Sequence, residues 1–209
     1  MPNVALSQHL SAREKHHDKQ IWTSLLAKQL SLELLDVFSN VVALAYLLNN
    51  HHKLKIEMNV YSFQDIAISI SYRLIRVRSL AGERPDNELE NVLHLALTAF
   101  ITPLFLTAST APLLPQLLQE AAQNYQQHDS ESRKIMLWVL FIGKSSFVFT
   151  NLHESWMIPM IAEASLNLGL RGWTDVHSVL SQFPWINLVH NNAGQELWEK
   201  VQKYSESHH

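Results

Sequence analysis

Cysteine is absent from this sequence of 209 residues, so a disulfide framework and a thiolate metal site are both excluded. Glycine is scarce, with 5 residues, which leaves little room for the many tight turns of an all-β fold. The polar first 20 residues contain no apolar signal-peptide core. The longest uninterrupted apolar run, Ile135 to Ile142, is too short to span a bilayer. We therefore expect an intracellular protein of the cytoplasm or nucleus, without membrane association.

An excess of positive charge is also lacking: the sequence has 16 Lys and Arg and 19 Asp and Glu, which gives a net charge of -3. Domains that bind nucleic acid through phosphate contacts usually carry a basic excess or a basic stripe. The densest basic stretch, Arg73, Arg76 and Arg78, has near-helical spacing and is interpreted as a solvated or ion-paired helix face. We expect no direct nucleic-acid binding by this chain.

Metal-binding and catalytic motifs are missing as well. The 12 histidines include adjacent pairs, such as His16-His17 and His51-His52, but no His-x-x-x-His spacing occurs. Neighbouring helical residues point too far apart to chelate one ion. The triplet Gly143-Lys144-Ser145 resembles the end of a phosphate-binding loop, but Trp138 stands where the upstream glycine is required. We predict no metal site and no cofactor, and we assign no catalytic residue.

Apolar residues at helical spacing are what the sequence does contain, and 47% of it is hydrophobic. Stripes at spacings of three and four, with caps and breakers between them, predict successive helices. Asn49 to His52 predict the end of the first helix, and Ser62 with Asp65 predicts a capping box for the second. Thr110 predicts the cap of the fourth helix, Asp129 or Ser130 that of the fifth, and Gly169 a C-terminal cap. The predicted helices cover about 18–48, 62–81, 87–102, 110–127, 130–149, 156–168, 173–182 and 194–204. The fold class is therefore all-α, an irregular multi-helix bundle of about seven to nine helices.

The predicted organisation is one helical domain over residues 19–204, with a flexible leader at 1–18 and a flexible tail at 205–209. The apolar stretch 145–149 could be a strand, but an isolated strand would have no partner. The proline-rich segment 103–115 is the best candidate for an internal boundary, although no linker separates two domains.

Several polar and aromatic residues are candidates for lining a ligand pocket. Asp36 and Asn40 lie four residues apart in an apolar segment, where they either pair structurally, with Arg73 or Tyr72, or anchor a ligand. Five of the six tryptophans fall in the last third, where they fill the core or wall a pocket for a flat or apolar ligand. The candidate ligand-binding residues are Asp36, Asn40, Tyr72, Arg73, Trp138, Lys144, His153 and Trp156.

A series of apolar and aromatic motifs runs from residue 136 to residue 198. These motifs are Met136 to Gly143, Trp156, Pro159, Leu168-Gly169-Leu170, Trp173 to Val176, Leu180, Phe183 to Ile186, His190 and Gly194 to Trp198. In order and spacing they resemble the fungal-specific transcription factor domain, the helical regulatory region of fungal zinc-cluster activators. The similarity covers most of the chain, although the first half is less distinctive. It implies a helical scaffold and a role in regulation, and these motifs carry no reaction.

The chain departs from that family in its DNA-binding part. The family reads DNA through six cysteines that hold two zinc ions, followed by a basic linker and a coiled coil. This sequence has no cysteine, so the DNA-reading module is absent from it. We expect either the C-terminal part of a longer regulator or a stand-alone relative that has lost DNA binding.

Two functions from different classes follow from the sequence. The first is a regulatory module that binds a small apolar metabolite or a partner protein, with DNA contact made elsewhere or not at all. The second is a stand-alone descendant recruited as an enzyme, of cyclase or isomerase type, for an apolar secondary metabolite. Such catalysis can depend on pocket shape and one or two polar groups, so the absence of a motif does not exclude it. Long apolar helices also permit a homo-oligomer.

Overall fold

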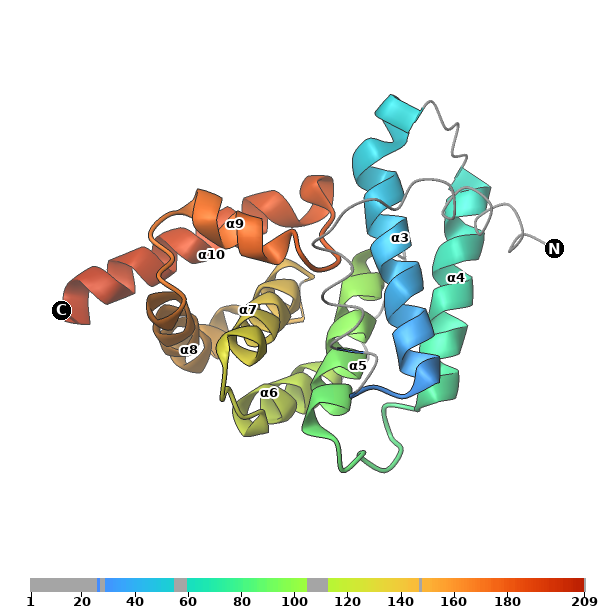
Figure 1. Cartoon of the computed structure of the whole chain (residues 1–209), viewed down its shortest axis with the longest axis horizontal. Helices are drawn as coiled ribbons and strands as arrows, with labels where there is room; N and C mark the ends of the chain where they lie inside the picture. Colours follow the sequence, from blue (N-terminus) through green and yellow to red (C-terminus); the bar gives the residue numbers. More distant parts are fainter. Residues whose placement is uncertain (1–25, 27–28, 55–59, 105–112, 147, 209) are drawn as a thin grey trace.

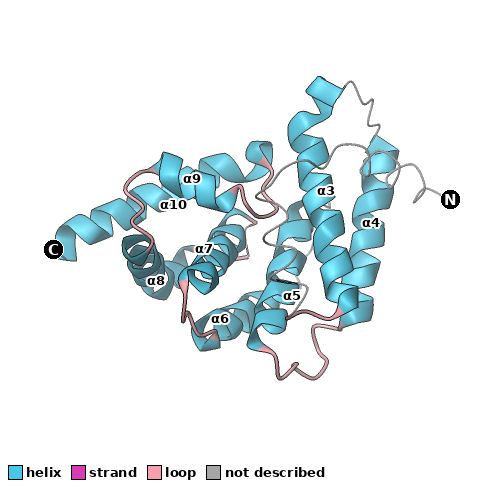
Figure 2. Ribbon diagram, viewed as in Figure 1, coloured by secondary structure: helices cyan, strands magenta, loops and turns pink. Residues whose placement is uncertain are grey.

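The computed structural model describes residues 26, 29–54, 60–104, 113–146 and 148–208. Within these ranges it contains eight α-helices, two short 3-10 helices and no strand, as Figure 2 shows. The predicted all-α bundle of seven to nine helices is confirmed. The α-helices are α3 (Leu32–Leu54), α4 (Val60–Val77), α5 (Glu88–Ile101), α6 (Leu114–Asn124), α7 (Ser130–Ser145), α8 (Glu154–Asn167), α9 (Trp173–Leu180) and α10 (Asn187–His208); the 3-10 helices are η1 (Thr102–Leu104) and η2 (Asn151–His153).

Helices α5 and α7 lie at the centre of the bundle (Figure 1). The antiparallel pair α3 and α4 packs beside α5 at one end, with α4 outermost, while α8, α9 and α10 surround α7 at the other end. Helix α6 packs against both α5 and α7. One hydrophobic cluster includes residues from all eight α-helices. The described part of the chain therefore has one continuous core.

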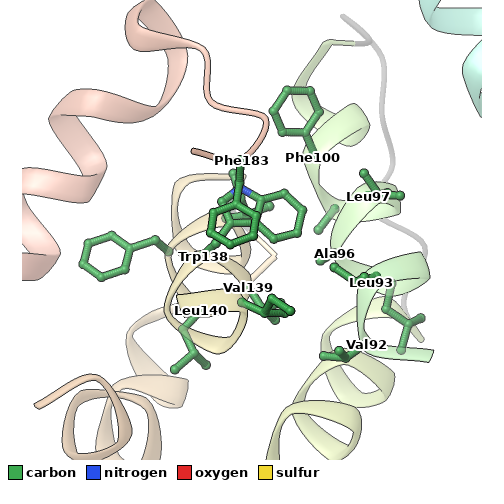
Figure 3. Close-up of a cluster of buried hydrophobic side chains, with 14 of the residues drawn as sticks. Val92, Leu93, Ala96, Leu97, Phe100, Trp138, Val139, Leu140 and Phe183 are labelled. Atoms are coloured by element: carbon green, nitrogen blue, oxygen red, sulfur yellow. The ribbon is translucent and has the colours of Figure 1, made fainter. Parts of the chain in front are cut away.

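Trp138 on α7 is the largest side chain that is fully buried in this core. Its indole Nε1 donates a hydrogen bond to the Pro184 carbonyl oxygen at 2.9 Å, and the Phe183 ring stacks on it with centroids 5.5 Å apart. Figure 3 shows that Leu97 and Phe100 of α5 belong to the same cluster. Phe183 and Pro184, which follow α9, are thus held against the central helix α7 by these contacts with Trp138.

The predicted caps of two helices are confirmed. The Asp129 carboxylate accepts a hydrogen bond from the Ser132 backbone N–H at 2.7 Å, which completes a capping box at the start of α7. Gly169, which follows α8, has a φ of 69°, in the left-handed region that glycine adopts without steric penalty.

The helix predicted over residues 18–48 is interrupted and ends later than expected, while its predicted start near residue 18 lies outside the described residues. Residues 29–31 form a turn before α3 begins at Leu32, and the Ser31 hydroxyl donates to the Glu90 carboxylate at 2.6 Å. The helix then continues past Asn49 to Leu54. Asn49 does not stop it, because its side chain finds distant partners instead: its amide donates to the Trp185 carbonyl at 2.6 Å and accepts from the Asn187 N–H at 2.9 Å.

Three other predicted boundaries also need correction. Helix α4 begins at Val60, so Ser62 lies inside the helix and does not cap it. Helix α7 ends at Ser145 rather than near Phe149, because the chain folds back and the Phe149 N–H donates to the Gly143 carbonyl at 2.8 Å. Helix α10 begins at Asn187, well before Gly194.

At its other end α10 reaches His208, so residues 205–208, predicted as a flexible tail, are helical. The predicted leader at 1–18 and the predicted cap at Thr110 lie outside the described residues. The extent of the single domain stays a prediction.

One described segment, Leu32–His51 of α3, is long and apolar enough to cross a bilayer by length and composition. Buried core helices pass the same test, and 44% of this segment is buried. Its inner face, including Leu34, Phe38 and Val41, belongs to the hydrophobic core. One such segment is only weak evidence for a membrane span. The compact helical fold is compatible with the predicted intracellular location.

Candidate functional site

Three of the predicted ligand-binding residues meet at the outer side of α3 and α4. The Arg73 guanidinium forms an ion pair with the Asp36 carboxylate, and the Asn40 side-chain amide donates to the Asp36 backbone carbonyl at 2.6 Å. These contacts satisfy the three polar groups within the fold. They agree with the interpretation of Asp36 and Asn40 as a structural pair held by Arg73.

Tyr72, the fourth residue from these helices, is 72% exposed. It lies on α4 with two other exposed apolar residues, Ile68 at 43% and Ile75 at 64%. The three occur at spacings of four and three, and residues at such spacings share one helix face. We call this set the α4 stripe (Ile68, Tyr72 and Ile75). Neither isoleucine was among the candidates predicted from the sequence. Their shared face becomes recognisable only when Ala67, Ile70 and Leu74 are known to be the buried positions of α4.

Lys144 belongs to a second polar cluster, which joins α7, α8 and α10. Its ammonium lies 2.8 Å from Glu154 Oε1, and the Lys200 ammonium lies 2.6 Å from the same oxygen. Burial raises the pKa of Glu154, but the hydrogen bonds from the two lysines outweigh it and the net pKa is lowered. Glu154 is therefore ionised, and its two ion pairs connect α8 to α7 and to α10. Glu154 and Lys200 were not predicted as site residues, because their contact joins parts of the chain that are 46 residues apart.

His153 and Trp156 lie near this cluster, on either side of the start of α8. The His153 Nδ1 accepts from the Thr150 backbone N–H at 3.1 Å, which is a helix-capping role. The Trp156 ring meets the edge of Phe149, with centroids 5.3 Å apart, and its buried Nε1 has no hydrogen-bond partner among the described residues.

The structure thus distributes the eight predicted ligand-binding residues over several places. Asp36, Asn40 and Arg73 come together. His153 and Trp156 both pack against Phe149, and Lys144 contacts the neighbouring Glu154. Tyr72 faces solvent on α4 and Trp138 is enclosed in the core.

The larger of two described cavities is a cleft of about 590 Å³ between the ends of α5, α6 and α7. Burial, with Asp129 and Glu88 nearby, raises the pKa of Tyr125 in this cleft to about 12, so its phenol stays neutral near pH 7. None of the eight predicted residues lines the cleft. Most of its lining residues are polar or charged: Gln29, Asp86, Asn87, Glu88, Leu89, Tyr125, Gln126, His128, Asp129, Glu131, Ser132 and Ile135.

The smaller cavity, of about 150 Å³, includes His94, Arg78 and Arg84 together with two glutamates in its lining. Burial lowers the pKa of His94, against the opposing effect of its hydrogen bond with the Leu74 backbone carbonyl. The Arg84 guanidinium is paired with Glu120, and Arg78 donates to the Asn91 side chain at 3.2 Å. These charges are balanced within the protein and leave no strongly charged site.

His190 on α10 is a second buried histidine. Its Nδ1 accepts from the Ile186 backbone N–H at 2.9 Å, and its ring packs against Phe100 and Trp185. Burial lowers its pKa to about 3, so it is neutral at physiological pH. The position of its neutral ring near the start of α10 assigns it a structural role.

Comparisons with known proteins identify no relative. No protein-family model matches the chain, and neither the curated proteins nor the solved structures provide a match. Across the described ranges, no group of three or more His, Cys, Asp or Glu side chains could hold a metal ion.

Proposed function

We propose that this protein is a regulatory helical module that contacts a partner protein through the α4 stripe. The observation that carries the proposal is the exposure of three large apolar side chains along one face of a single helix. Scattered single apolar residues are normal on a surface, whereas adjoining ones mark interaction sites. Anchors at spacings of three and four are the usual pattern when a helix face packs against another helix or a groove.

Helix α4 is apolar on two opposite sides, which supports this proposal. Its inner face places Ala67, Ile70 and Leu74 in the core, and its outer face presents the α4 stripe. A helix that is apolar on both sides is usually buried on both sides. Among the described helices α4 packs against α3 and α5, and its exposed outer side suits an added helical partner.

The resemblance to the fungal transcription factor domain supports a role in regulating transcription, in the nucleus. Its most specific motifs, over residues 136–198, coincide with the tightly packed helices α7 to α10. In this proposal that region is the scaffold, and α4 makes the contact. DNA binding would be supplied by another chain or another segment.

The alternatives in which a small apolar metabolite binds or reacts within the helices require an apolar cavity. Most residues that line the cleft of about 590 Å³ are polar or charged. This cleft therefore favours neither a metabolite sensor nor a cyclase or isomerase, and contact with a protein is the function that the geometry supports best.

A tethering experiment tests the proposal. The chain is fused to a heterologous DNA-binding domain, and transcription of a reporter carrying its operator is measured in fungal cells. We expect the fusion to change transcription several-fold, and Tyr72→Glu to return it to background, because a charge on the stripe opposes burial against a partner. Leu188→Glu is the matched control, since Leu188 is 94% exposed on α10, away from α4.

Circular dichroism and thermal melting establish that both variants stay folded. A fusion without any effect on the reporter would overturn the proposed regulatory role. Equal effects of Tyr72→Glu and Leu188→Glu would show that the α4 stripe is not the contact surface.

A further inference from the structure

The outer face of α4 carries a charge at each end of its stripe. Asp65 lies one turn before Ile68 and Arg76 lies one turn after Tyr72, and both charged residues are exposed. At about 100° per residue, these residues and Ile75 fall within an arc of about 100° around the helix axis. The face therefore has an acid at its N-terminal end, apolar residues in the middle and a base at its C-terminal end.

Neither end charge is used within the described fold. Among the ion pairs of the described residues, α4 contributes Arg73, which pairs with Asp36 of α3, but neither Asp65 nor Arg76. Arg73 differs from Arg76 because it points toward α3. Two opposite charges about three turns apart on one face are too distant to pair with each other, but they can pair with charges on another helix.

We infer that the partner of this face is a second copy of the same chain, with the two α4 helices packed antiparallel about a twofold axis. This inference rests on the proposed function and deepens it by naming the partner. In an antiparallel pair centred at the level of residues 70 and 71, Asp65 of each copy lies level with Arg76 of the other. The same arrangement places Tyr72 of each copy level with Ser69 of the other, next to Ile68.

The charge order on α4 selects this orientation. A parallel pair would place Asp65 against Asp65 and Arg76 against Arg76, and like charges in contact are unfavourable. The antiparallel pair makes the same ion pair twice, as an isologous twofold contact requires. The face is thus complementary to itself, which a surface shaped for an unrelated partner would not need to be.

The size of the contact determines the expected strength. One helix from each copy contributes a small interface, in the class below about 1,200 Å² of total buried surface. We therefore expect a reversible dimer with a dissociation constant in the micromolar range, which weakens as salt screens the end charges.

Sedimentation equilibrium of the purified full chain, across micromolar to submillimolar concentrations, tests the inference through charge exchange. Asp65→Arg alone and Arg76→Asp alone each place like charges together, and we expect each to weaken the dimer at least tenfold. The double variant Asp65→Arg/Arg76→Asp restores both ion pairs with reversed sign and should dimerise as the original chain does.

Mixing the two single variants provides the sharpest measurement. In a mixed dimer, the Asp65→Arg copy carries a base at both ends of its stripe and the Arg76→Asp copy carries an acid at both ends. Both end contacts then join opposite charges, so a heterodimer should form where neither variant associates with itself. Glu196→Arg and Lys203→Asp, at exposed positions of α10, make the same charge changes elsewhere and should leave the dimer unaltered.

The inference is overturned if the original chain stays monomeric throughout the concentration range, or if it dimerises without sensitivity to the charge exchange. A monomeric chain whose reporter effect is still lost in Tyr72→Glu would keep the proposed function and replace the second copy by another protein. A charge-sensitive dimer without any reporter effect would keep this inference and remove the regulatory role. The two failures are therefore distinguishable.

Discussion

The helices from α7 to α10 pack their tryptophan rings against the core, whereas the outer helix α4 presents a row of three large apolar side chains to solvent. In the former, aromatic rings pack inward: Trp138 stacks with Phe183, and Trp185 packs against His190. In α4, three of the large apolar side chains face outward. The comparison separates scaffold from surface, although both segments have a similar apolar pattern in the sequence.

The fit between α9 and α10 illustrates how tightly the scaffold is packed. A Cβ atom added at Gly194 would lie 2.8 Å from the Trp173 ring and 3.2 Å from the Trp185 ring. Such distances leave no space for a side chain. The outer face of α4 has no described counterpart of this kind, so a change there should affect association far more than folding.

The largest expected difference between the two regions comes from removing one aromatic ring from each. Trp138→Ala should lower the free energy of unfolding by about 3–5 kcal/mol, because it leaves a large core cavity and deprives the Pro184 carbonyl of its donor. Tyr72→Ala should change it by at most about 0.5 kcal/mol, since the ring is mostly exposed. Urea denaturation of both variants measures the two values, and similar losses would contradict the division into scaffold and surface.

A smaller difference is expected between the ion pairs of the two regions. Glu154→Ala leaves two lysines without their partner, at a site where Glu154 and Lys144 are each 17% exposed. The loss in the free energy of unfolding should be about 1.5–3 kcal/mol. Asp36→Ala removes a pair whose side chains are 39% and 56% exposed, and its effect should stay below about 1 kcal/mol. Equal effects in the same urea titrations would refute this ranking.

The pH dependence of stability should reflect the scaffold rather than α4. The pKa of His190 is about 3 in the fold and about 6.5 in an unfolded chain. Between these values the unfolded state binds more protons, so the free energy of unfolding falls as the pH drops from about 6.5 toward 3. From pH 7 to pH 5 His190 should contribute a loss of about 2 kcal/mol.

Urea denaturation at pH 7 and pH 5 checks this expectation. His190→Asn keeps an acceptor near the Ile186 N–H and should reduce the difference between the two pH values by that amount. His94, whose pKa burial also lowers, acts in the same direction in both proteins and cancels in the comparison. An unchanged pH dependence in His190→Asn would show that His190 is not the responsible group.

The helical fold could be predicted from the sequence because apolar spacing and caps are local signals. A cap at Asp129 or Ser130 and a C-terminal cap at Gly169 were both predicted from neighbouring residues, and the structure has them at Asp129 and Gly169. The errors occurred where a distant residue decides a boundary. The Phe149 N–H donates to the Gly143 carbonyl and so ends α7 early. The Asn49 side chain hydrogen-bonds to the backbone of Trp185 and Asn187 instead of ending α3.

The contacts among the polar candidate residues could be predicted only in part, because residues far apart in the sequence decide them. The contact between Asp36 and Arg73 was anticipated, and both residues lie on helices adjacent in the chain. The tie from Lys200 to Glu154 spans 46 residues between α8 and α10 and has no local signature. Exposure also has no sequence signature by itself, so Tyr72 was named without its neighbours Ile68 and Ile75.

The side chain of Asn49 has a consequence for the order in which the protein folds. Its carbonyl oxygen satisfies the first backbone N–H of α10, at Asn187, across 138 residues of sequence. The first turn of α10 therefore obtains its cap from another helix, and it cannot be completed before α3 has docked. Contacts between such distant segments form slowly, because a long loop must close first. The beginning of α10 should accordingly be among the last parts of the chain to acquire protection from hydrogen exchange during refolding.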